Sequence, residues 1–146
     1  MAMAREEHDI EALAPLRPSV RLCKGIYLEP PSIAFQEFEA IRASFVACLD
    51  ALLATGARTA IATHDEWLLE RTVERVAGLD RDAFELQMLL GVRGDRAREL
   101  VAAGYPLRVY VPYGRQWYEY SLRRLQENPK VAGYVARDVV GRVFRR

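Results

Sequence analysis

The sequence has few cysteines and no metal-binding pattern, and each of these absences excludes a class of protein. Its 146 residues include only two cysteines, Cys23 and Cys48, which are too few for a disulfide framework. No CxxC motif or Cys/His cluster is present, so we expect no bound zinc or other metal. A chain without a disulfide framework is typical of a reduced compartment, and we therefore expect a cytoplasmic protein.

The sequence also lacks an excess of charge and any long apolar run. Its 21 Lys plus Arg residues against 20 Asp plus Glu give a formal net charge of +1, so charge indicates no nucleic-acid partner. The apolar runs are too short for a transmembrane segment, and no signal peptide opens the chain, so at most we expect a peripheral contact with a membrane. A hydrophobic content of 51% indicates a globular domain large enough to bury a core.

Strand-like and helix-like segments alternate along the chain. Apolar residues at helical spacing predict a long helix from Phe38 to Leu52 that stops near Gly56. Alternating patterns bounded by turn residues predict four strands, at residues 19–24, 59–63, 83–90 and 107–111. Further helices are predicted at residues 6–14, around Leu68 and Leu69, and at residues 95–103, 117–127 and 131–144. This order requires parallel strands with right-handed crossovers, so the fold class is α/β.

The chain length leaves two architectures open. Four strand–helix units are too few for a complete eight-stranded barrel, which needs about 250 residues, so the chain is either a small open sheet or part of a barrel. Strand alternation puts Glu85, Gln87 and Leu89 on one face of the third strand and Arg108 and Tyr110 on one face of the fourth. Helices on both faces would bury these polar side chains at a cost in free energy. The pattern favours a barrel whose interior holds a ligand.

One polar stripe near the C-terminus is a candidate binding site. Tyr120, Arg123, Arg124 and Glu127 have helical spacing i, i+3, i+4 and i+7, so they share one face of the predicted helix. From the spacing alone, a solvent-exposed face is the more frequent explanation. His64 has no Ser or Cys near it in sequence, so nothing indicates a nucleophilic triad.

Five segments together resemble the C-terminal half of the proline dehydrogenase family, which are flavin-dependent (β/α)8 barrels that oxidise proline. They occur in the family's order: RLCKGIYLE at 21–29, IATHD at 61–65, FELQMLLG at 84–91, RVYVPYG at 108–114 and YSLRRLQE at 120–127. Five ordered matches are more specific than any one of them. The resemblance implies that residues 1–146 form a partial proline dehydrogenase domain, with four parallel βα units of a TIM barrel plus a terminal helix. This portion runs from the fifth strand of the barrel to its last helix.

The resemblance implies that FAD is the cofactor. Arg21 would hydrogen-bond the flavin ring near N5 as a catalytic residue, because a fixed cation there stabilises the charge that builds up on the reduced flavin. Ile26 stands where family members usually carry alanine, and its bulk would narrow the pocket. The role of Asp65 is left open. The residues implied to bind the cofactor are Arg21, Lys24, Gly25, Ile26, Thr63, His64 and Gln87.

The resemblance also implies that L-proline is the substrate. Paired guanidinium groups of Arg123 and Arg124 would clamp its carboxylate, Tyr120 would pack on its ring, and Glu127 would hold the two arginines in place. Hydride would pass from C5 of proline to flavin N5, which gives 1-pyrroline-5-carboxylate. The electrons would then go to a quinone or another electron acceptor. Two further residues implied to line the substrate pocket are Leu89 and Tyr110.

The first four strands of the family's barrel have no counterpart in the sequence. We therefore expect a fragment that carries the flavin-binding and carboxylate-binding half of the site and is inactive alone. Half a barrel exposes strand edges and its interior face, so we also expect either a complementing N-terminal half or a homo-oligomer. The alternative is a non-catalytic remnant or a protein-interaction module derived from the same barrel.

Overall fold

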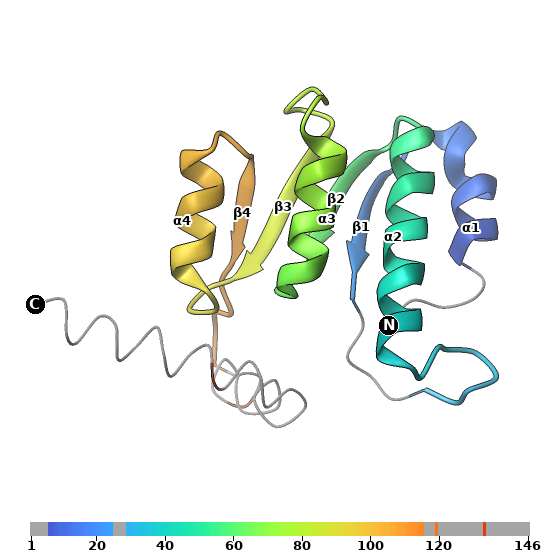
Figure 1. Ribbon diagram of the computed structural model, residues 1–146, viewed down its shortest axis with the longest axis horizontal. Coiled ribbons are helices and arrows are strands. Elements are labelled where there is room, and N and C mark those ends of the chain that lie inside the picture. Colours follow the sequence, from blue (N-terminus) through green and yellow to red (C-terminus); the bar gives the residue numbers. More distant parts are fainter. Residues whose placement is uncertain (1–5, 25–28, 116–118, 120–132, 134–146) are drawn as a thin grey trace, which may run out of the picture. The chain divides into compact units, whose positions relative to one another are not determined.

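The computed structural model describes residues 6–24 and 29–115, together with Glu119 and Gly133. Its strands form one four-stranded sheet in the order β1-β2-β3-β4, and a helix separates each strand from the next (Figure 1). The predicted α/β class is therefore confirmed. Apart from Glu119 and Gly133, the helices predicted at residues 117–127 and 131–144 lie outside the described residues. The elements are α1 (Glu6–Leu13), the 3-10 helix η1 (Ala14–Leu16), β1 (Ser19–Cys23), α2 (Phe38–Ala54), β2 (Arg58–Ala62), α3 (Glu66–Val76), β3 (Phe84–Leu89), α4 (Gly94–Ala102) and β4 (Leu107–Tyr110).

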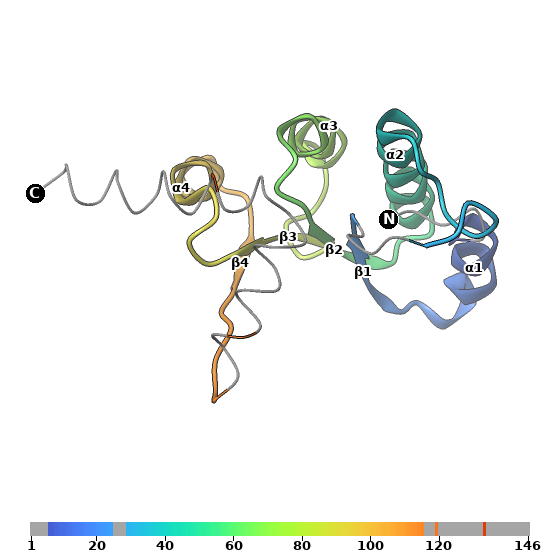
Figure 2. The ribbon, with the colours of Figure 1, turned by 90° about the horizontal axis from the view of Figure 1, so that it is seen from below.

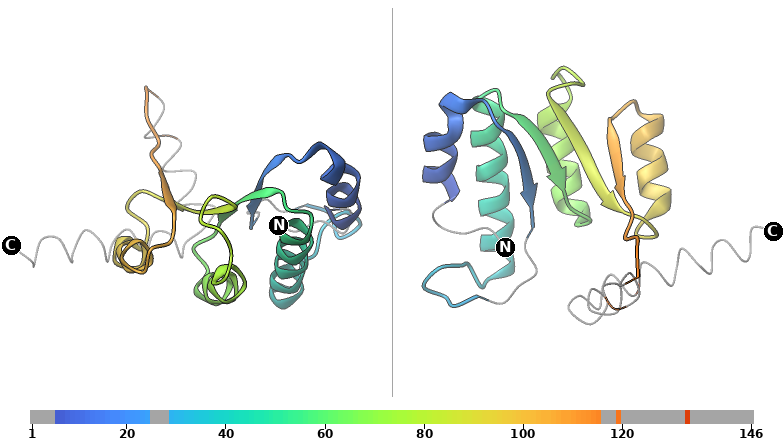
Figure 3. Two further views of the ribbon diagram at one scale, coloured as in Figure 1. Left: turned by 90° about the horizontal axis from the view of Figure 1, so that it is seen from above. Right: turned by 180° about the vertical axis from the view of Figure 1, so that it is seen from behind.

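The chain divides into two compact units, Met1–Leu86 and Gln87–Arg146, and the division falls within β3. In the first unit β1 and β2 pair in parallel, with Ser19 opposite Arg58. Helices α2 and α3 lie on one face of these strands, and α1 lies beside β1 (Figures 2 and 3). The opposite face of β1 and β2 carries no helix among the described residues. In the second unit α4 packs on β4, and the Leu90 N–H donates to the Tyr110 carbonyl over 2.9 Å.

Successive side chains of β1 and β2 point to opposite faces of the sheet. Leu22 of β1 and Ile61 of β2 are opposite each other and buried toward the helices. Arg21 and Ala60 are also opposite each other, and alternation places both on the helix-free face. The helix side of the core consists of Phe45, Cys48, Leu49 and Leu52 of α2, Leu68, Leu69, Thr72 and Val76 of α3, and Phe84 and Leu86 of β3.

The ends of α1 and α2 follow from proline and glycine. α1 ends at Leu13, and Pro15 lies in the first turn of η1, where its missing N–H costs no hydrogen bond. The turn closes when the Arg17 N–H donates to the Ala14 carbonyl over 3.1 Å. α2 ends at Ala54, and Gly56 follows with a φ of +71°, a conformation that glycine adopts without steric cost.

Neither cysteine forms a disulfide. Cys23 is exposed at the end of β1, and Cys48 is buried in α2. Within the described ranges, no helix combines the length and the apolar character that crossing a bilayer requires.

The buried hydroxyl of Thr72 in α3 lowers the stability of the fold. Thr72 is 0% exposed, and its Oγ1 has no hydrogen-bond partner among the described residues. A buried polar group without a partner costs free energy, and valine has the same shape without the hydroxyl. We expect Thr72→Val to raise the free energy of unfolding by about 1 kcal/mol, measured by urea denaturation.

Thr59 is the matched control for this substitution. It is also 0% exposed, but its Oγ1 donates to the Ala57 carbonyl over 3.0 Å. Thr59→Val removes that hydrogen bond and is expected to lower the free energy of unfolding by about 1 kcal/mol. If both substitutions shifted stability in the same direction, the hydroxyl of Thr72 would not be the cause.

Candidate functional site

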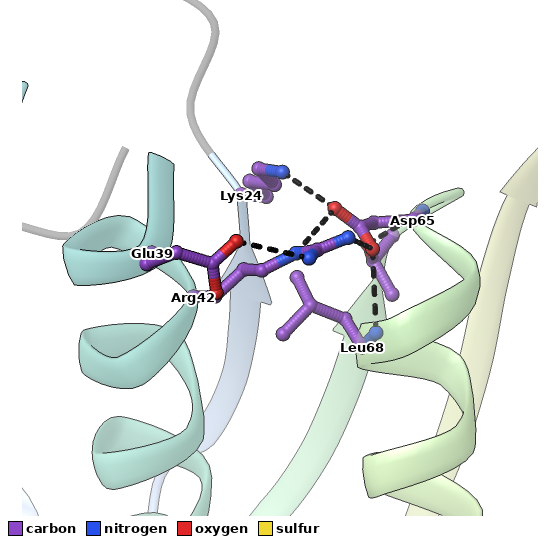
Figure 4. A network of polar contacts seen from close by, with 6 residues as sticks. Lys24, Glu39, Arg42, Asp65 and Leu68 are labelled. Atoms are coloured by element: carbon purple, nitrogen blue, oxygen red, sulfur yellow. Dashed lines mark hydrogen bonds and ion pairs between the residues drawn. The ribbon is translucent and has the colours of Figure 1, made fainter. Parts of the chain in front are cut away.

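The carboxyl ends of β1 and β2 bring together two segments that are far apart in sequence. Lys24 follows β1, and Thr63, His64 and Asp65 follow β2. Because the strands are parallel, their carboxyl ends lie at the same edge of the sheet, which is where α/β folds bind ligands. The Lys24 Nζ donates to Asp65 Oδ2 over 2.7 Å, an ion pair across 41 residues of sequence (Figure 4).

Arg42 of α2 completes this cluster. Its Nη2 donates to Asp65 Oδ1 over 2.8 Å and its Nε donates to Oδ2 over 3.2 Å. The guanidinium group therefore binds the carboxylate in a bidentate manner (Figure 4). Its Nη1 also contacts the exposed Glu39 over 3.3 Å. The sequence analysis missed Arg42, because 23 residues separate it from Asp65 and no motif links the two.

Asp65 also starts α3. Its Oδ1 accepts the Leu68 N–H over 3.4 Å, the contact of an N-cap residue. The Asp65 N–H in turn donates to the Oγ1 of the buried Thr63 over 3.2 Å. These two local contacts fix the path of the chain from the end of β2 into α3, so the carboxylate has a defined position at the sheet edge.

Aromatic rings flank the two cations. The Phe38 ring centroid lies 4.3 Å from the Lys24 Nζ and 4.1 Å from the Arg42 guanidinium carbon. The Trp67 ring lies 5.2 Å from the same guanidinium carbon. In such cation–π contacts, the electron-rich face of the aromatic ring attracts the positive charge. Lys24 and Arg42 are therefore held by the carboxylate and by aromatic faces together.

The cluster keeps Asp65 ionised. Its side chain is 10% exposed, and this burial alone would raise the pKa of the carboxyl group. Hydrogen bonds from Arg42 and Lys24 and their positive charges outweigh burial and lower the pKa of Asp65 from its ordinary 3.8 to about 2. The hydrogen bond to Asp65 likewise raises the pKa of Arg42. Asp65 therefore serves as a fixed anion rather than as an acid or base near neutral pH.

This lowered pKa predicts a pH-dependent stability. The folded-state pKa of Asp65 is below the unfolded value, so its contribution to stability is nearly complete above about pH 4 and is lost as pH falls through about 2. We expect Asp65→Asn to lower the free energy of unfolding by about 1–2 kcal/mol at pH 7, after allowance for solvent screening. Urea denaturation at several pH values should show that this difference shrinks below about pH 4 and disappears only below about pH 2. A difference independent of pH would contradict the assignment.

The residues expected to bind the cofactor are only partly within the described ranges. Arg21 is exposed on the helix-free face. Lys24 and Thr63 each form a hydrogen bond with Asp65 at the carboxyl ends of β1 and β2. The half-buried His64 lies between Thr63 and Asp65 in the sequence. Gln87 in the second unit is half-buried on β3. Gly25 and Ile26 lie outside the described residues.

The residues expected to bind the substrate lie in the second unit. Leu89 is half-buried on β3, and Tyr110 is exposed at the end of β4. The polar stripe is not described by the structure, so its predicted role stays a prediction for Tyr120, Arg123, Arg124 and Glu127.

The polar side chain of Glu85 has a partner within the chain. The side chain of Glu85 is 9% exposed, and its Oε2 accepts a hydrogen bond from the Arg58 Nη2 over 3.2 Å. Arg58 begins β2, so the pair lies at the end of that strand opposite to the Lys24–Asp65 cluster. This ion pair satisfies a polar residue on β3 without a ligand.

The described residues fit a flat, anionic cofactor such as FAD. Within the described residues, Lys24 donates one hydrogen bond, to Asp65, so two of its three N–H donors remain for another acceptor. The neighbours of Arg21 and Cys23 on β2 are Ala60 and Ala62, whose small side chains occupy little space on the helix-free face. A cation at the end of β1 beside small side chains is a chemically suitable arrangement for a phosphate-bearing ring system.

Comparisons with known proteins identify the family. A sequence profile described as proline dehydrogenase matches residues 14–137. The chain belongs to the proline dehydrogenase family. This match confirms the predicted family. The four-stranded α/β sheet is consistent with part of a proline dehydrogenase barrel, as predicted.

Individual proline dehydrogenases support the same assignment. The chain is 40% identical over 134 residues to the proline dehydrogenase of Deinococcus radiodurans, covering 90% of this chain and 43% of that protein. It is 38% identical over 138 residues to proline dehydrogenase 1 of Bacillus subtilis strain 168, covering 93% and 46%. With proline dehydrogenase 2 of the same strain the identity is 42% over 127 residues, covering 86% and 42%. The chain spans less than half the length of these curated relatives.

Proposed function

We propose that this chain forms the flavin-binding and carboxylate-binding part of an FAD-dependent proline dehydrogenase, which oxidises L-proline to 1-pyrroline-5-carboxylate. The observation that carries the proposal is the family match over residues 14–137. Residues 1–146 would then supply the portion of the (β/α)8 barrel from its fifth strand to its last helix. The parallel β1 and β2, with α2 and α3 on one face, agree with such a portion of a barrel.

In this proposal, strand-end residues hold FAD. Lys24 binds an anionic group of the cofactor, and Gly25, Ile26, Thr63, His64 and Gln87 line its site. Arg21 acts as the catalytic residue, because its fixed positive charge stabilises negative charge on the ring system. When bound, FAD supplies the hydride-accepting chemistry that no amino-acid side chain provides. The exposed position of Arg21 on the helix-free face supports its role.

The substrate would be held by the second unit and the C-terminal stripe. Arg123 and Arg124 orient L-proline through its carboxylate, since paired guanidinium groups fix both the position and the direction of that group. Tyr120, Leu89 and Tyr110 complete the pocket around the ring. A quinone or another electron acceptor takes the electrons after each turnover.

A complementing N-terminal half, or a second copy, is the partner that we propose. A largely apolar cavity of about 300 Å³ lies between α1, β1 and α2, and Ile10, Leu13, Val20 and Leu52 are among its lining residues. Apolar surface beside a strand favours the packing of a further element there. The same cavity would serve an interaction module derived from the barrel, which is the second candidate function.

The activity test compares this chain alone with the chain plus a separately expressed remainder of a relative. We expect no proline-dependent reduction of a redox dye by the chain alone, and reduction when both parts are present with FAD. Absence of reduction in both samples would contradict the enzymatic proposal and leave the interaction module.

A further inference from the structure

The side chain of Lys24 is held by one carboxylate. A lysine ammonium ends a flexible four-carbon side chain, so it needs a partner to keep one orientation. Asp65 provides that partner at 2.7 Å, and the Lys24 side chain remains 22% exposed. Its contact with the Phe38 ring limits the other directions that the ammonium can take. The two remaining donors of Lys24 therefore stay at the edge of the sheet.

The carboxylate of Asp65 has no capacity left for a ligand. A carboxylate has about four acceptor sites. Those of Asp65 are used by Lys24, by two nitrogens of Arg42 and by the N–H of Leu68 (Figure 4). Because its acceptor sites are all occupied, Asp65 can influence a bound molecule only by orienting the residues that it contacts.

We propose that Asp65 is a positioning residue, which orients the Lys24 ammonium toward an anionic group of the cofactor and does not itself touch the cofactor. The inference rests on the proposed function, because it takes Lys24 as a cofactor-binding residue. Fixing the lysine before binding reduces the conformational entropy lost when the cofactor binds. Arg42 and the first turn of α3 hold Asp65 in the required place.

The first test needs no cofactor and uses the small number of lysines. The chain has two, Lys24 and Lys130, so brief acetylation with acetic anhydride followed by mass spectrometry reports their relative reactivity. Asp65→Asn retains a side chain that can cap α3 and accept from Arg42, but it removes the charge that holds Lys24. We expect the ratio of Lys24 to Lys130 acetylation to rise by about threefold or more.

Asp50→Asn is the matched control. Asp50 of α2 pairs with Arg75 of α3 over 2.6 Å, so it is also a carboxylate in an arginine pair between these helices. It has no contact with Lys24 among the hydrogen bonds and ion pairs of the described residues. Its substitution is expected to leave the acetylation ratio unchanged. An unchanged ratio in Asp65→Asn, or equal rises in both variants, would overturn the proposal.

The second test separates positioning from a general loss of structure. FAD is titrated into the full chain carrying Lys24→Met, Asp65→Asn or both, and flavin fluorescence gives the dissociation constant. Each single substitution is expected to weaken binding about tenfold, and the double variant should match Lys24→Met alone. Independent effects that multiply, or full affinity in Asp65→Asn, would overturn the inference. If the unsubstituted chain binds no FAD, the proposed function fails, and the acetylation ratio alone decides whether Asp65 orients Lys24.

Discussion

Replacing Asp65 by alanine is expected to lower the free energy of unfolding at pH 7 by about 3 kcal/mol. The substitution removes the N-cap of α3 and leaves two partly buried cations, Lys24 and Arg42, without their shared anion. Unpaired buried charge and a lost cap are both among the largest single-residue effects on stability. Urea or thermal denaturation of the purified variant measures the loss.

Asp50→Ala shows whether the size of this effect comes from burial. Asp50 is also paired with an arginine, Arg75, but its side chain is 52% exposed, against 10% for Asp65. Exposed ion pairs contribute little, so its loss is expected to cost less than about 1 kcal/mol. Equal losses in the two variants would contradict a special role for the Asp65 cluster in the fold.

Replacing Arg21 by methionine is expected to weaken FAD binding by about 10-fold to 100-fold. Methionine keeps much of the apolar length of the side chain but removes the charge and all donors. Because Arg21 is exposed on the helix-free face of β1, we expect the fold to survive the substitution.

Arg17→Met is the control for Arg21→Met. Arg17 is an exposed arginine just before β1, outside the sheet, and its loss is expected to leave FAD affinity unchanged. Fluorescence titration of FAD with both variants makes the comparison. Equal affinity in the two variants would show that Arg21 does not contact the flavin.

Most of the fold in the described residues could be predicted from side-chain periodicity. Helical spacing from Phe38 to Leu52 and the alternation of buried Phe84, Leu86 and Met88 were sufficient to predict α2 and β3. The second strand lies one residue earlier than predicted, at Arg58–Ala62, because the Thr63 hydroxyl already accepts from the Asp65 N–H in the turn. Side-chain contacts with the backbone of this kind are not visible in a hydrophobicity pattern.

The candidate site was less predictable than the fold. Lys24 and Asp65 belong to segments that resemble the family, but their ion pair depends on the parallel pairing of β1 and β2. Arg42 reaches Asp65 from α2 and belongs to none of the five matching segments. The polar face of β3 indicated a ligand-lined interior, yet Glu85 on that face pairs with Arg58. Contacts between distant segments require the fold to be known first.

The most direct test is the absorption spectrum of the purified chain after incubation with FAD and removal of unbound flavin. If the strand ends and the helix-free face form a cofactor site, a flavin band near 450 nm remains with the protein, and Arg21→Met reduces it. If no flavin stays bound at micromolar chain concentration, then the residues around Arg21 and Lys24 do not form a flavin site in this chain.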